Sequence, residues 1–166
     1  MTAAARLERL TNLLYGLACV MFVGTVAELV AAKHYEEPLQ FVPFILCGLG
    51  LAVTLLAWRR PSSANLSALR VLMVLLIAGS LLGVWKHIEG NMGFIQEMHP
   101  DTTGWPLVSG ALAGRAPLLA SGALAVSGAI AVTASFAAGW QGASMSAEEG
   151  RIERSAPVGG SRAVAR

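Results

Sequence analysis

The residues best suited to chemistry in this chain are two histidines, each followed two positions later by a glutamate. His34 and Glu36 form the first pair, His87 and Glu89 form the second, and a lysine precedes each histidine. Imidazole and carboxylate groups are ligands of zinc, iron and manganese, and two methionines beyond the second pair would extend the choice toward copper. The two motifs therefore predict a metal site if the fold brings them together.

The spacing within each motif limits this interpretation. Residues two apart on an α-helix point about 200° away from each other, so a His-x-Glu pair can bind one ion only where the helix has ended. A haem between His34 and His87 is an alternative, because two histidines on two helices at one height are its minimum requirement. Gly24, Gly79 and Gly83 would leave space beside its macrocycle.

A structural interpretation of the motifs is favoured over both. Histidine, glutamate, lysine and tyrosine are ordinary residues at a headgroup boundary, and the repeat then records the duplication of a helical hairpin. On this interpretation the protein is an accessory or oligomeric membrane scaffold. Gly79 and Gly83 have the small-xxx-small spacing that lets helices approach closely, within one bundle or in a homo-oligomer.

Glu28 is the one acid that lies inside an apolar stretch. It precedes Lys33 by five residues, which places it about 7–8 Å along the helix axis from that lysine. A carboxylate at this depth is costly and usually faces a bundle interior or a water-filled cavity. Glu28 is expected either to reach toward Lys33 or to join His34 and His87 as a further ligand or hydrogen-bond partner.

The elements that must position these residues follow from the composition. The 166 residues are 55% hydrophobic and 13% charged, with a mean hydropathy of +0.60, whereas soluble domains carry about 25% charged residues. Four apolar stretches, 10–32, 39–58, 68–85 and 117–138, are each near the ~20 residues that cross a bilayer as a helix. The sequence predicts an all-α, four-transmembrane-helix bundle.

The position of the motifs divides this bundle into two repeated helical hairpins. Each motif follows one membrane-length stretch and precedes the next, so each is expected at a turn. Residues 1–9 form the predicted cytoplasmic N-terminus, 10–139 the transmembrane domain and 140–166 a disordered cytoplasmic tail. The tail is rich in Gly, Ser, Ala and Arg and lacks the apolar residues to fold alone.

The distribution of lysine and arginine predicts the orientation. One side of the four-pass topology carries Arg6, Arg9, Arg59, Arg60, Arg70, Arg151, Arg154, Arg162 and Arg166, and the other carries Lys33, Lys86 and Arg115. By the positive-inside rule both termini are cytoplasmic, and the long segment 88–116 is an external loop. The net charge of +2 thus reflects membrane insertion and gives no support to nucleic-acid binding.

Two further motif patterns link the chain to a family. After the first apolar stretch the sequence has E-L-x4-H-x-E, beginning at Glu28, and after the third it has H-x-E-G-N, beginning at His87. In these patterns the chain resembles a group of small four-helix bacterial membrane proteins of unassigned function. The resemblance covers roughly residues 15–101 and implies a location in the bacterial inner membrane. The chain contains no nucleophile–base pair, phosphate loop or nucleotide fingerprint, which disfavours an enzyme.

Overall fold

The computed structural model describes residues 2–36, 38–114 and 119–155, and all the regular structure among them is helical. The long helices are α1 (Ala3–Ala31), α2 (Val42–Arg59), α3 (Ser63–Met98) and α5 (Leu119–Ser155), and the short ones are η1 (Pro38–Phe41) and α4 (Trp105–Leu112). Each long helix contains a segment that is long and apolar enough to cross a bilayer. The predicted all-α bundle with four membrane-spanning helices is confirmed, and the chain is an integral membrane protein.

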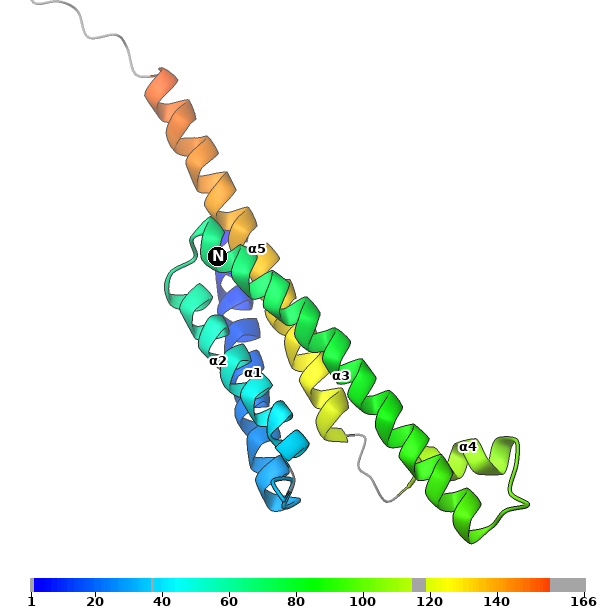
Figure 1. Ribbon diagram of the computed structural model, residues 1–166. Helices are drawn as coiled ribbons and strands as arrows, with labels where there is room; N and C mark the ends of the chain where they lie inside the picture. The colour runs from blue at the N-terminus through cyan, green and yellow to red at the C-terminus, as the bar shows by residue number, and fades with distance from the viewer. Residues whose placement is uncertain (1, 37, 115–118, 156–166) are drawn as a thin grey trace, which may run out of the picture.

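The long helices form two antiparallel pairs (Figure 1). α1 packs against α2 and α5, while α3 packs against α2, α4 and α5. Among the described residues the backbones of α1 and α3 do not approach each other closely, so these two are the diagonal helices of the bundle. The start of α1, the α2–α3 connection and the end of α5 lie at one end of the molecule, and the α1–α2 turn and α4 lie toward the other (Figure 1).

Side-chain hydrogen bonds and proline mark where the helices begin. The Thr2 hydroxyl accepts a hydrogen bond from the backbone N–H of Ala5, and the Ser62 hydroxyl accepts one from that of Asn65. These contacts satisfy amides that have no partner within a first helical turn. Pro43 lies in the first turn of α2, where its missing N–H costs no helix hydrogen bond.

The packing suits lipid as the surrounding solvent. Large apolar side chains such as Leu13, Val20 and Leu75 are exposed on the outer faces of the helices. Hydroxyl side chains are buried inside the bundle, and several donate to a carbonyl one turn earlier: Thr11, Thr25, Thr54 and Ser127. Small hydroxyl residues allow close helix packing without an unsatisfied donor in the apolar interior.

α3 does not end at the second motif, which corrects the prediction of a turn there. The apolar stretch was expected to end at Trp85, yet α3 continues to Met98, so His87 and Glu89 lie within a helix. Hydropathy indicates where the bilayer ends, whereas a helix ends where a stop signal interrupts its hydrogen bonds, and here that signal is Pro100.

The predicted external loop 88–116 is also largely helical. Its described residues, 88–114, include the last turns of α3 and the whole of α4, which folds back against α3 (Figure 1). The buried amide Nδ2 of Asn91 donates to the carbonyl of Ala111 at 2.9 Å. Gly114 lies so close to Asn91 that a Cβ added there would be 2.5 Å from Asn91 Cγ. A polar anchor and a small residue thus join α3 to α4.

The tail prediction is wrong for residues 140–155, because α5 continues as a helix to Ser155. These residues cannot bury enough apolar surface to fold alone, as their composition indicated. Extending a helix that the bundle has already nucleated requires only propagation, which alanine, glutamate and arginine favour. Residues 156–166 and the predicted start of the fourth helix at Pro117 lie outside the described residues.

Candidate functional site

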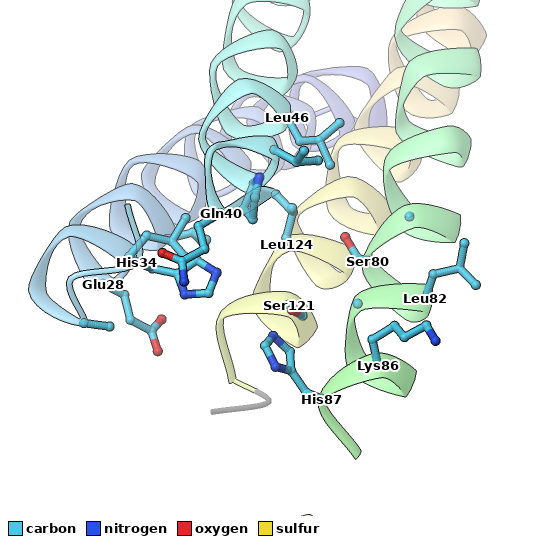
Figure 2. Close-up of a pocket in the computed structure, with 17 residues that line it drawn as sticks. Glu28, His34, Gln40, Leu46, Ser80, Leu82, Lys86, His87, Ser121 and Leu124 are labelled. Carbon is cyan, nitrogen blue, oxygen red and sulfur yellow. The ribbon is translucent and has the colours of Figure 1, made fainter. Parts of the chain in front are cut away.

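A pocket of about 410 Å³ opens between the two hairpins, near the turn that joins α1 to η1 and α2. Its walls come from α1, α2, α3 and α5 (Figure 2). The apolar part of the lining includes Leu29, Val42, Pro43, Leu46, Leu82 and Leu124. The polar part includes Glu28, His34, Gln40, Ser80, Lys86, His87 and Ser121.

His34 is held in the pocket by the way α1 ends. The N–H of Lys33 donates to the carbonyl of Val30 at 3.0 Å, and the N–H of His34 donates to that of Leu29 at 2.9 Å. This pair of hydrogen bonds is a Schellman motif, and Lys33 has the left-handed φ of 51° that the motif requires. The turn therefore directs the His34 side chain back over the end of its own helix and into the pocket.

His87 meets His34 across the pocket from α3. The two ring centroids are 6.4 Å apart, and the ring planes are inclined at 55° (Figure 2). His87 lies two residues beyond the apolar stretch 68–85 and is partly buried. Burial lowers the pKa of His87 below its ordinary value of 6.5, and the nearby His34 ring lowers it further. Both effects favour a neutral His87 imidazole.

Glu28 lines the same pocket as the two histidines, and the residue is exposed (Figure 2). The sequence left open whether this carboxylate pairs with Lys33 or turns toward the histidines. No described residue lies within ion-pair distance of it, Lys33 included. The fold thus places three of the predicted site residues, Glu28, His34 and His87, around one space.

The other two predicted site residues do not line this pocket. The Glu36 side chain is exposed, and its backbone N–H donates to the Gln40 side chain at 2.8 Å. Glu89 is exposed and pairs with Lys86 at 2.7 Å, one turn away on α3. The reason is helical geometry: two positions along α3 carry Glu89 to a different face from His87.

Ser80 is a pocket residue that the sequence analysis did not identify. Its side chain is 3% exposed, its hydroxyl has no hydrogen-bond partner among the described residues, and it points into the pocket (Figure 2). Ser80, Gly83 and His87 follow the spacing of one helix face. This spacing is the sequence signal for Ser80, and it becomes informative when the helix is taken to continue through His87.

The two glycines of the small-xxx-small motif have different surroundings. A Cβ added to Gly83 would be 3.2 Å from the Ser121 hydroxyl, so Gly83 lies at the contact between α3 and α5. A Cβ added to Gly79 would meet no atom within 4 Å, and Gly79 lines the pocket. In this chain Gly83 therefore serves packing within the bundle, and Gly79 leaves the pocket open.

No protein-family model, curated protein or solved structure matches this chain. The chemistry of the site must therefore be inferred from the pocket itself. Within residues 2–36, 38–114 and 119–155 no three His, Cys, Asp or Glu side chains are close enough together to hold a metal ion. The arrangement instead combines apolar walls with a carboxylate, two imidazoles, an ammonium group, an amide and several hydroxyls, which suits a ligand that has both apolar and polar parts.

Proposed function

We propose that this membrane protein binds a small amphiphilic molecule in the pocket between its two hairpins. The observation that carries the proposal is the pocket itself, with apolar walls and with Glu28, His34 and His87 together at one end. Its volume of about 410 Å³ lies within the range of about 300–1,000 Å³ that is typical of small-molecule sites. Few, convergent polar groups in a mostly apolar cavity are the usual composition of such sites.

The pocket is the reason to prefer a binding role to the scaffold role that the sequence favoured. A scaffold needs closely packed helices, and protein interiors normally leave few voids larger than a water molecule. Here the helices separate to leave a pocket that Gly79 and Ser80 of α3 line. A bare glycine and an unpartnered hydroxyl on the wall are better explained by an occupant than by packing.

The test is to fill the pocket and measure what the protein retains. Gly79→Phe places an aromatic ring where a Cβ has free space, whereas Gly24→Phe places the same ring at an exposed glycine of α1 outside the pocket, with equal freedom. Small molecules extracted from the purified proteins are identified by mass spectrometry. We expect one species to accompany the wild type and Gly24→Phe and to be absent from Gly79→Phe. The same extract from all three proteins would contradict the proposal.

A metal or haem centre is a second candidate, and the approach of His34 and His87 favours it. Their ring centroids are 6.4 Å apart, within reach of one ion between two imidazole nitrogens, each about 2.0–2.1 Å from zinc. Elemental analysis of the purified protein would show stoichiometric zinc, copper or iron, and a Soret band would indicate haem. Either signal should be lost in His87→Ala and kept in His99→Ala, because His99 is exposed at the end of α3.

Glu28 would support such a centre by accepting a hydrogen bond from one imidazole and holding it in one tautomer. In that case Glu28→Gln and His87→Ala should be coupled by about 0.5–3 kcal/mol in a double-mutant cycle of unfolding, whereas independent residues add within about 0.5 kcal/mol. Additive effects without a lost metal would exclude this role for Glu28.

We further propose that the protein resides in the bacterial inner membrane with both termini in the cytoplasm, as the resembling proteins imply. What supports the orientation is the gathering of basic residues at one end. Arg6, Arg9, Arg59 and Arg60 occur in the start of α1 and the α2–α3 connection, which lie at that end together with the last turns of α5 (Figure 1). The pocket then opens near the external surface.

A further inference from the structure

One carboxylate that lines the pocket has no ion-pair partner among the described residues. The Lys86 ammonium group is paired with the Glu89 carboxylate at 2.7 Å, so it adds little net positive charge to the opening. Burial and the neighbouring His34 ring keep the pKa of His87 below its ordinary value, which favours a neutral imidazole near pH 7. The Glu28 carboxylate has no cationic partner among the described residues.

An unpaired carboxylate at this depth is unfavourable. Glu28 is an exposed residue in the last helical turn of α1, in a segment apolar enough to cross the bilayer, and the pocket it lines is bounded mainly by apolar side chains. A carboxylate within a membrane-spanning segment is costly unless an opposite charge or hydrogen bonds compensate it. A cation that enters the pocket would supply that compensation, and an anion would add repulsion.

Ser80 indicates a second polar contact farther inside. It lies seven residues before His87 on α3, which is about 10 Å deeper along the helix axis. Its hydroxyl is buried, points into the pocket and lacks a partner among the described residues (Figure 2). Buried hydroxyls are normally hydrogen-bonded, because leaving one unsatisfied costs free energy.

We propose that the pocket selects organic cations: amphiphilic amines whose ammonium group pairs with Glu28, with their apolar body between α2, α3 and α5. Ser80 hydrogen-bonds a polar atom of that body in ligands that have one. This inference rests on the proposed function, since it names the ligand class of the same pocket. Glu28 is the residue that determines the charge preference, and the apolar walls determine the affinity common to all amphiphiles.

The test compares three probes that share one compact apolar cage: 1-adamantylamine, 1-adamantanol and adamantane-1-carboxylate. The full-length protein is placed in phosphatidylcholine nanodiscs near neutral pH, and binding is measured by calorimetry against empty nanodiscs. We expect the amine to bind about tenfold more tightly than the alcohol, a difference of about 1.4 kcal/mol, and the carboxylate to bind most weakly.

Four variants identify the cause of the preference. In Glu28→Gln the amine should bind about as weakly as the alcohol, while the alcohol affinity is unchanged. Glu28→Asp keeps the negative charge and should keep the preference for the amine. This variant is the control for misfolding caused by substitution at this position. Glu97→Gln, an exposed acid near the end of α3 outside the pocket, should behave as the wild type. Arg115→Gln should also do so, and a gain in amine affinity there would show that Glu28 already has a partner.

The outcomes separate this inference from the proposal on which it rests. Equal binding of the three probes by the wild type, abolished by Gly79→Phe, would overturn the charge preference and leave amphiphile binding intact. A preference for the amine that survives in Glu28→Gln would overturn the role of Glu28. Failure of all three probes to bind the wild type would overturn both.

Discussion

At the scale of single residues, protonation of His87 makes the stability of the protein depend on pH. The folded protein lowers the pKa of its imidazole through burial and through the neighbouring His34, so the folded state binds a proton less readily than the unfolded chain does. The contribution of His87 to stability is therefore complete above its ordinary pKa of 6.5 and is lost as the pH falls through the lower folded value.

This direction can be measured by thermal unfolding in detergent. We expect the melting temperature of the wild type to fall between about pH 7.5 and about pH 5.5, and to fall less in His87→Gln, which cannot take up the proton. His99→Gln, at the exposed end of α3, should retain the wild-type dependence. Identical pH profiles for the wild type and His87→Gln would contradict the assignment.

Lys33 is the residue that shapes the turn carrying His34. Its φ of 51° lies in the left-handed region, which costs an L-residue roughly 1–2 kcal/mol and glycine almost nothing. We expect Lys33→Gly to stabilise the protein by about 1 kcal/mol and Lys33→Val to destabilise it, because β-branched residues avoid this region. Chemical unfolding monitored by circular dichroism would measure both. A destabilised Lys33→Gly would mean that the lysine side chain contributes more than the strain costs.

At the scale of the helices, Gly50 is a point where α2 packs tightly against both α1 and α3. A Cβ added there would be 2.7 Å from two ring carbons of Phe22 on α1 and 3.3 Å from Leu76 on α3. Gly48, two positions earlier on the same helix, has nothing within 4 Å of such an atom. The same substitution at the two glycines therefore separates packing from helix propensity.

Gly50→Ala should lower the free energy of unfolding by about 1–3 kcal/mol, because Phe22 and Leu76 are buried and leave little room for the extra methyl group. Gly48→Ala should be neutral or stabilising by up to about 1 kcal/mol, since alanine favours the helix. Thermal and denaturant unfolding in the same detergent would compare them. Equal tolerance of both changes would show that α2 can move away from α1 and α3.

The continuation of α3 beyond Trp85 explains why His87 faces the pocket. Because α3 stays helical through the second motif, His87 lies on the same helix face as Gly83 and Ser80, nearer the opening. A turn before His87 would have removed its side chain from that face. The same continuity moves Glu89 to another face, where it pairs with Lys86.

At the scale of the whole molecule, the orientation predicts where tags become accessible. Reporter fusions at residue 64 and after Arg166 should give cytoplasmic signals, and a fusion at Thr103 should give an external signal. Residue 64 and Thr103 lie toward opposite ends of the bundle, and α5 ends at the same end as residue 64 (Figure 1). An alkaline phosphatase and green fluorescent protein pair would report both sides. A cytoplasmic signal at Thr103 would place the pocket opening on the cytoplasmic side.

The sequence by itself determined that the chain lies in a lipid bilayer and that its fold is all-α. Apolar stretches of membrane length require helices, since a backbone in lipid must satisfy its hydrogen bonds internally, and this requirement depends on composition alone. The repeated motifs also identified His34 and His87 as candidate site residues. The position of Glu28 inside an apolar stretch identified it as a third candidate. These inferences rest on residue type and local spacing.

Only the tertiary structure decided which of these residues share a space. Glu28, His34 and His87 converge because α1 ends in a left-handed turn at Lys33 and because α3 continues past His87, and neither event is visible in hydropathy. Glu89 stays outside because helix geometry directs it to another face of α3, and Glu36 is exposed in the turn after α1. The pocket exists because two helix pairs separate beside Gly79, which depends on how all four helices pack and is encoded in no single segment.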